Sequence, residues 1–297
     1  MLSTKSRKGG VSSVLRTAPR LRAVTGRQWW DGEYEDLQVR AHEASGRRVA
    51  VVTLDLPERR NSMSGPMTAS WVEVMRLLRD DRDLAAVVVT GAAPAFCAGG
   101  DLSWIVSEPD ASVPDLRDRM LAFYRSWLAI RDLEVPTIAA VNGAAIGAGF
   151  AVALACDLRY VADGAKLGVP FTALGLHPGM ATTWSLPDVA GHAVARDLLL
   201  TGRIVTGEEA VRLGLASRAL PADEVLGEAL AAAERIAAAA PVATRLTLQA
   251  LRGGGHADHE TALQWEALAQ ATTLATADVH EGIAAAAGRR TPQFRGR

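Results

Sequence analysis

The chain is poor in cysteine, in net charge and in long apolar runs, and each shortage excludes a class of protein. Its 297 residues include two cysteines, which exclude a disulfide framework and a CxxC metal knuckle. The formal net charge of −1 gives no overall field that would attract nucleic acid or a membrane surface. No apolar run reaches the roughly 18 residues that a membrane-spanning helix needs. We therefore expect a cytoplasmic protein with no metal site, no nucleic-acid partner and no membrane partner.

Motifs of several catalytic classes are also missing. The chain has no P-loop GK[ST] and no GxSxG, so neither a P-loop nucleotide site nor a Ser–His–Asp hydrolase is expected. Gly147-Ala148-Gly149 lacks the GxGxxG spacing of a dinucleotide site. Cys97 and Cys156 are expected to be buried, reduced thiols. A nucleophilic role for Cys97 would need an activating base, and no histidine lies near it in the sequence.

The N-terminal segment differs from the rest of the chain in charge. Its first 30 residues carry seven Lys or Arg residues and no acidic residue, and they lack the apolar core of a secretory signal. Residues 1–36 are therefore expected to form a basic, flexible extension. A transit-like segment and an arm for an anionic partner such as RNA are the alternatives.

Strands alternate with helices over the first two-thirds of the chain. Short β-branched runs predict buried strands, and apolar residues at helical spacing predict helices between them. The strands are expected at 49–54, 85–90, 137–141 and 158–162, with helices from 64, at 114–133 and up to 155. This alternation predicts an α/β core over residues 37–220. Residues 221–297 predict helices alone, at 221–240, from 241 and at 258–275.

Two turns rich in glycine and alanine follow predicted strands, at residues 95–102 and 142–149. Small residues let the backbone approach a ligand closely, and a helix N-terminus presents unpaired N–H groups. Two such donors that meet at one carbonyl oxygen can stabilise it as it becomes an oxyanion. The turns therefore predict a backbone oxyanion site.

Longer stretches around these turns resemble one family. VAVVTLDLPERRNSMS, FCAGGDLSWI and PTIAAVNGAAIGAGFAVALACDLRYVA closely resemble the enoyl-CoA hydratase/isomerase (crotonase) family, in the family's order, from about residue 49 to the end of the chain. The resemblance implies a spiral of repeated ββα units with a C-terminal α-helical trimerisation region at 221–297. It also implies a homo-oligomer, either a trimer or a dimer of trimers. The expected partner is an acyl-CoA thioester, with no separate cofactor because coenzyme A is part of the substrate.

The resemblance assigns roles to residues of both turns. The oxyanion-hole N–H groups are expected at Ala98 and Ala148, while Asp101 and Asp157 are expected to be structural. Phe294 is expected to approach the nucleotide of a neighbouring subunit. The full set expected to contact the acyl chain or coenzyme A is Arg59, Ser62, Met63, Gly99, Gly100, Asp101, Leu102, Trp104, Ala151, Phe171 and Phe294.

Both glutamates that hydratases of this family use as an acid/base pair are missing. Ala151 and Phe171 stand at their places, so ordinary water addition is not expected. His177 is the proposed substitute, because imidazole ordinarily titrates near neutral pH. Acidic residues of the segment 104–115 are an alternative source of a carboxylate. Gly179 stands where dehalogenases of the family carry a nucleophilic aspartate, so dehalogenation is not expected.

The sequence thus predicts an acyl-CoA-binding enzyme, similar to an enoyl-CoA hydratase or isomerase, that stabilises a thioester enolate with backbone N–H groups. The alternative is a non-catalytic carrier or sensor of acyl-CoA on the same fold. Turnover of an acyl-CoA separates the two hypotheses.

Overall fold

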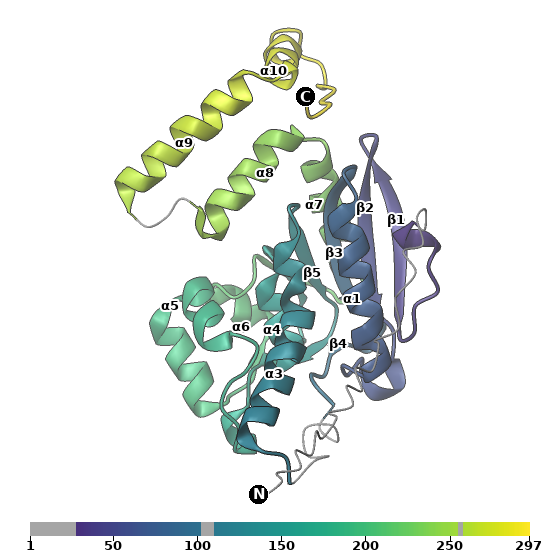
Figure 1. Ribbon diagram of the computed structural model, residues 1–297, viewed down its shortest axis with the longest axis vertical. Helices are drawn as coiled ribbons and strands as arrows, with labels where there is room; N and C mark the ends of the chain where they lie inside the picture. The colour runs from purple at the N-terminus through teal and green to yellow at the C-terminus, as the bar shows by residue number, and fades with distance from the viewer. Residues whose placement is uncertain (1–27, 102–109, 255–257) are drawn as a thin grey trace, which may run out of the picture.

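The computed structural model describes residues 28–101, 110–254 and 258–297 (Figure 1). The described chain starts with a 3₁₀ turn, η1 (Trp29–Asp31), whose Trp29 is 2% exposed. The indole N–H of Trp29 donates to Asp81 Oδ2 at 2.8 Å, and the hydroxyl of Tyr34 donates to the carbonyl of Trp29. The extension predicted over residues 1–36 therefore overlaps the folded body from residue 28 onward, and residues 1–27 lie outside the described part.

The larger sheet has six strands and forms the centre of the body. Its first two strands pair antiparallel and the remaining pairs are parallel. Every residue of β3 and β5 is buried, as expected for a parallel sheet covered on both faces. The strands, in spatial order, are β1 (Leu37–Ala44), β2 (Arg47–Leu54), β3 (Leu84–Gly91), β5 (Thr137–Val141), β7 (Leu158–Ala162) and β10 (Arg218–Leu220).

A second sheet of four short strands lies beside the first. Its first three strands run parallel, and the last pairs antiparallel. The chain passes from β3 to β4, from β5 to β6 and from β7 to β8, so three neighbouring strands of the larger sheet are followed by three neighbouring strands of the smaller one. The strands are β4 (Ala95–Cys97), β6 (Ala144–Ile146), β8 (Lys166–Gly168) and β9 (Val205–Thr206).

Helices follow the strands as the alternation predicts. α1 (Gly65–Asp80) starts at Ser64, whose hydroxyl accepts the N–H of Met67 at 3.0 Å. Residues Met67, Trp71, Val74, Met75 and Leu78 form its buried face, which confirms the predicted spacing. The further helices and 3₁₀ turns of this part are η2 (Pro57–Arg59), α3 (Val113–Leu128), η3 (Ala129–Asp132), α4 (Ala148–Ala155), η4 (Thr172–Leu174), α5 (Thr182–Thr201) and α6 (Gly207–Arg212).

The C-terminal part is entirely helical, as predicted, and has one helix more than the prediction. It consists of α7 (Val225–Ala237), α8 (Pro241–Gln249), a π-helical turn (Ala250–Gly254), α9 (His259–Leu274) and α10 (Ala277–Ala287). α7 packs against the larger sheet, whereas α8, α9 and α10 extend away from it (Figure 1). No residue of α9 is buried. A trimerisation role for this region remains a prediction.

In the described ranges, no helix combines the length and the hydropathy that crossing a membrane requires.

Candidate active site

A cavity of about 240 Å³ opens where β4 and β6 end. One side, which we call the strand wall, consists of the turns that follow these strands: Ala98, Gly99, Gly100, Ile146, Gly147 and Ala148. The other side, the helix wall, comes from α3 and the segment around η4: Met120, Phe123, Tyr124, Pro170, Phe171, Leu174, Leu176, His177, Gly179 and Met180.

Direct strand pairing brings the two turns of the strand wall together. β4 and β6 are parallel neighbours, with Ala95 opposite Ala144 and Cys97 opposite Ala145. The turns approach so closely that a side chain would not fit between them. A Cβ added to Gly149 would lie 2.3 Å from the carbonyl oxygen of Cys97, and one added to Gly99 would lie 2.8 Å from that of Ile146. The glycines predicted to allow close approach therefore allow the two turns to approach each other.

Asn61 holds the first turn from behind, and the sequence did not single it out. The residue is fully buried in a left-handed conformation, with φ 55°. Its Oδ1 accepts the N–H of Leu56 at 2.9 Å, while its Nδ2 donates to the carbonyls of Ala92 and Ala95 at 2.7 and 2.8 Å. Asparagine tolerates this backbone conformation better than most residues, which is the signal that could have identified it.

The N–H groups of the strand wall differ from the prediction at one position. The N–H of Ala98 donates to the carbonyl of Arg60 at 2.9 Å, so it is not available to a ligand, and its predicted role is wrong. The N–H of Gly100, two residues later, has no acceptor among the described residues. The same is true of Ala148, the first residue of α4, whose N-cap Gly147 makes no side-chain cap. Two unpaired N–H groups therefore lie along the strand wall, at Gly100 and Ala148.

Neither position of the missing glutamates supplies a polar group. Ala151 is 1% exposed inside α4 and does not line the cavity, so the contact predicted for it is absent. Phe171 does line the cavity, and its ring lies 3.8 Å from where a Cβ on Gly147 would stand. Of the described residues, no Asp or Glu lines this space. Asp115, from the segment proposed as an alternative, accepts the hydroxyl of Ser112 at the start of α3 instead.

His177 and Tyr124 supply the polar side chains of the described lining. His177 is exposed at the cavity rim, and its Nδ1 lies 2.8 Å from the carbonyl oxygen of Pro178. A carbonyl can only accept, so Nδ1 carries a proton, and in the neutral ring Nε2 has the lone pair. Tyr124, which the sequence did not single out, is half-buried, and burial raises the pKa of its phenol. Tyr124 reaches the cavity only because α3 packs beside it, and no motif near Tyr124 in the sequence indicates this packing.

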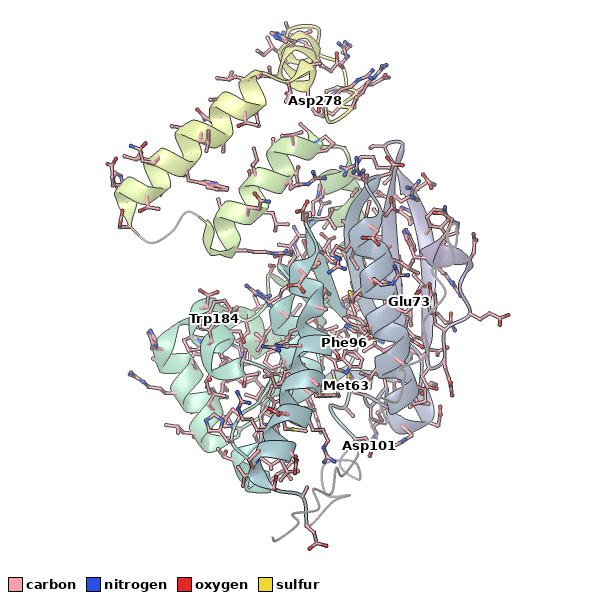
Figure 2. The ribbon with its side chains drawn as sticks, viewed as in Figure 1. Met63, Glu73, Phe96, Asp101, Trp184 and Asp278 are labelled. Carbon is pink, nitrogen blue, oxygen red and sulfur yellow. The ribbon has the colours of Figure 1, made fainter. Side chains whose placement is uncertain are left out.

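Four residues predicted to contact coenzyme A, Arg59, Ser62, Met63 and Asp101, lie beside the first turn and outside the cavity lining. Arg59 forms an ion pair with Asp101 at 2.8 Å, and Figure 2 places Asp101 at the lower edge of the body. This pair is consistent with the predicted structural role of Asp101. Met63 is buried, and its N–H donates to the carbonyl of Gly99 at 2.8 Å. The Oγ of the adjacent Ser62 is buried and has no hydrogen-bond partner in the described part of the chain.

Three further predicted positions lie elsewhere. Leu102 and Trp104 fall outside the described residues, as does the acidic Glu108. Phe294 lies against Gly282 of α10, in a separate hollow between α8 and α10. It does not line the cavity of this chain, so its approach to a neighbouring subunit's nucleotide remains a prediction.

The cysteines and Asp157 have structural roles. Cys97 and Cys156 are buried, and burial raises the pKa of each thiol to about 12, which rules out Cys97 as an activated nucleophile. Asp157 accepts from the backbone N–H of Thr137 at 2.7 Å and pairs with Arg252 at 2.7 Å, so it has a structural role as expected, although it joins β5 to Arg252 instead of bracing the end of α4. The described residues contain no cluster of three His, Cys, Asp or Glu residues that could hold a metal ion.

Comparisons with known proteins agree with the resemblance of the motifs. The family model for enoyl-CoA hydratase/isomerase matches residues 44–297. A "Probable enoyl-CoA hydratase EchA14" of Mycobacterium tuberculosis is 40% identical over 247 residues, covering 81% of this chain and 94% of that protein. The 2,3-dehydroadipyl-CoA hydratase of Escherichia coli is 34% identical over 253 residues, covering 84% and 96%. The crystal structure of an enoyl-CoA hydratase from Bacillus anthracis superposes with a TM-score of 0.82 at 31% identity, covering 89% of this chain and 100% of that one.

Proposed function

Because the chain belongs to the enoyl-CoA hydratase/isomerase family, we propose that it binds an acyl-CoA thioester in the cavity and stabilises the enolate of that thioester. The observation that carries this proposal is the pair of unpaired N–H groups at Gly100 and Ala148, on turns that paired strands hold together. An unpaired backbone N–H beside an apolar space is costly unless a ligand or water accepts it. The oxygen of a thioester carbonyl can accept both.

The surroundings of these donors favour a developing negative charge. The N–H of Ala148 opens α4, where the helix dipole adds positive potential. The cavity is mainly apolar, so charge–dipole interactions there are stronger than in water. Removal of one such donor typically costs about 10²–10³ in rate. The strand wall therefore suits the enolate oxygen better than the neutral carbonyl.

Proton transfer at the α-carbon needs a base, and His177 is the candidate. In the neutral ring its Nε2 has the lone pair, because Nδ1 donates to the carbonyl of Pro178. The side chain lines the cavity and also reaches solvent, so a proton taken from the ligand can leave through it. Tyr124 does not compete as a base, because the raised pKa of its phenol keeps it protonated at neutral pH.

Isotope exchange tests both parts of the proposal. Butyryl-CoA is incubated with the protein in D₂O, and deuterium at the α-carbon is followed by mass spectrometry. We expect exchange in the wild type and a loss of about 10²-fold or more in His177→Gln. His192→Gln on α5 is the matched control, because His192 does not line the cavity. Exchange that survives His177→Gln unchanged would contradict the role of the histidine.

The alternative is a non-catalytic acyl-CoA carrier or sensor, and the lack of any carboxylate in the described lining favours it. This function predicts binding of butyryl-CoA with no α-deuterium and no mass change for any acyl chain. The same exchange experiment, combined with a binding isotherm, separates the carrier from the enzyme.

A further inference from the structure

The hydroxyl of Tyr124 is a polar group in an otherwise apolar part of the helix wall. Tyr124 lies on α3, next to Phe123, whose ring centroid is 6.3 Å from its own. The residue lines the cavity and is half-buried. Its hydroxyl has no hydrogen-bond partner among the described residues. A group in this position either meets water or meets a ligand.

The chain leaves room for this hydroxyl at Gly179. A Cβ on Gly179 would lie 2.4 Å from Tyr124 Oη and 2.9 Å from Cζ. Gly179 does not have a positive φ, so its backbone conformation does not itself demand glycine. The carbonyl of Gly179 accepts the N–H and the hydroxyl of Thr182, at 3.1 and 2.8 Å, rather than the phenol. The glycine therefore accommodates the phenol without binding it.

The Tyr124 hydroxyl would make a hydrogen bond with an acyl chain that carries an oxygen, but not with a plain alkyl acyl chain. Burial raises the pKa of Tyr124, so the hydroxyl keeps its proton and can donate. A plain alkyl chain that displaces water from the cavity leaves the hydroxyl without a partner, which is unfavourable. A chain with a hydroxyl or oxo group at the same place restores the hydrogen bond.

We propose that Tyr124 is a specificity-determining residue that hydrogen-bonds an oxygen on the acyl chain, so that the cavity takes hydroxy- or oxo-acyl-CoA thioesters in preference to unsubstituted ones. The inference rests on the proposed thioester site. The strand wall and Tyr124 line the same cavity, so an acyl chain held at its thioester carbonyl can bring an oxygen on the same acyl chain to Tyr124.

Binding isotherms for three probes test this inference: hexanoyl-CoA, 3-hydroxyhexanoyl-CoA and 5-hydroxyhexanoyl-CoA. We expect the wild type to bind at least one hydroxylated probe about tenfold more tightly than hexanoyl-CoA. Tyr124→Phe removes only the hydroxyl and should bring this ratio close to one. Tyr160→Phe is the matched control, since Tyr160 lies in β7 away from the cavity, and it should keep the wild-type ratio.

The outcomes separate this inference from the proposed function. If the wild type binds all three probes equally, or if Tyr124→Phe keeps the preference, the role of Tyr124 is wrong while thioester binding stands. If the wild type binds none of the probes, the proposed function fails and this inference fails with it. Gly179→Ala, which crowds the hydroxyl, should also reduce the ratio.

Discussion

The two walls of the cavity differ in what they offer a ligand. The strand wall presents backbone N–H groups, fixed by strand pairing and by the buried side chain of Asn61. The helix wall presents side chains, several of them exposed, such as Leu174 at 58% and Leu176 at 36%. Backbone donors cannot be exchanged by substitution, whereas side chains can. The difference assigns stabilisation of the oxyanion to the strand wall, and proton transfer by His177 and selectivity for the acyl chain to the helix wall.

The largest effect is expected where the two turns touch. Gly149→Val should slow α-deuterium exchange by about 10²-fold or more. The new side chain would push Cys97 and the first turn away from the second turn and so separate the two backbone donors. Overpacking should also lower the free energy of unfolding by about 1–3 kcal/mol. Gly164→Ala is the control, since nothing lies within 4 Å of a Cβ there. If a folded Gly149→Val variant exchanged α-deuterium at the wild-type rate, the strand wall would not be the part of the site that stabilises the enolate.

Asn61→Ala tests the support behind the strand wall. The substitution leaves the N–H of Leu56 and the carbonyls of Ala92 and Ala95 without this partner, so the free energy of unfolding should fall by about 1–3 kcal/mol. Urea denaturation measures the change. Asn142, the chain's other asparagine, is only half-buried. Asn142→Ala should therefore lower the free energy of unfolding by less than Asn61→Ala does. An equal loss in the two variants would show that Asn61 has no special bracing role.

The buried thiols of Cys97 and Cys156 make the stability of the fold depend on pH. Burial raises the pKa of Cys97 from 9.0 to about 12, so unfolding releases its proton above pH 9. Stability is therefore complete below pH 9 and falls as the pH rises toward 12, by about 1.4 kcal/mol per thiol at pH 10. Urea midpoints from pH 8 to 10 measure the slope. Cys97→Ala should remove about half of the slope, because Cys156 still contributes, and an unchanged slope would show that the Cys97 thiol does not contribute.

The smallest effect on stability is expected on the helix wall. Leu174→Ala should change the free energy of unfolding by no more than about 0.5 kcal/mol, because the side chain is largely exposed. Affinity for longer acyl chains should nevertheless fall about fivefold, from roughly 1 kcal/mol of lost apolar contact. Leu200→Ala, exposed on α5 outside the cavity, should change neither quantity. If Leu174→Ala left the affinity for longer acyl chains unchanged, the proposed role of the helix wall in selecting the acyl chain would be contradicted.

The sequence predicted the strand wall better than the helix wall, for a physical reason. Single strands and glycine turns depend on local patterns, so β5 and β7 begin and end at the predicted residues, although β4 and β6 lie inside segments predicted as turns. Even there, the pairing of Ala98 with Arg60 is a contact between separate segments, and it moves the donor to Gly100. Tyr124 and Gly179 are far apart in the chain, and their contact depends on how α3 packs. No local pattern carries that information.

The thioester carbonyl of a bound ligand reports most directly on the two backbone donors. Its stretching band is measured by isotope-edited infrared spectroscopy with [1-¹³C]butyryl-CoA, free and bound to the wild type. If Gly100 and Ala148 donate to the oxygen, the C=O bond is polarised and the band moves to lower wavenumber on binding. A band that stays at its position in water, with the ligand demonstrably bound, would contradict the proposed oxyanion site.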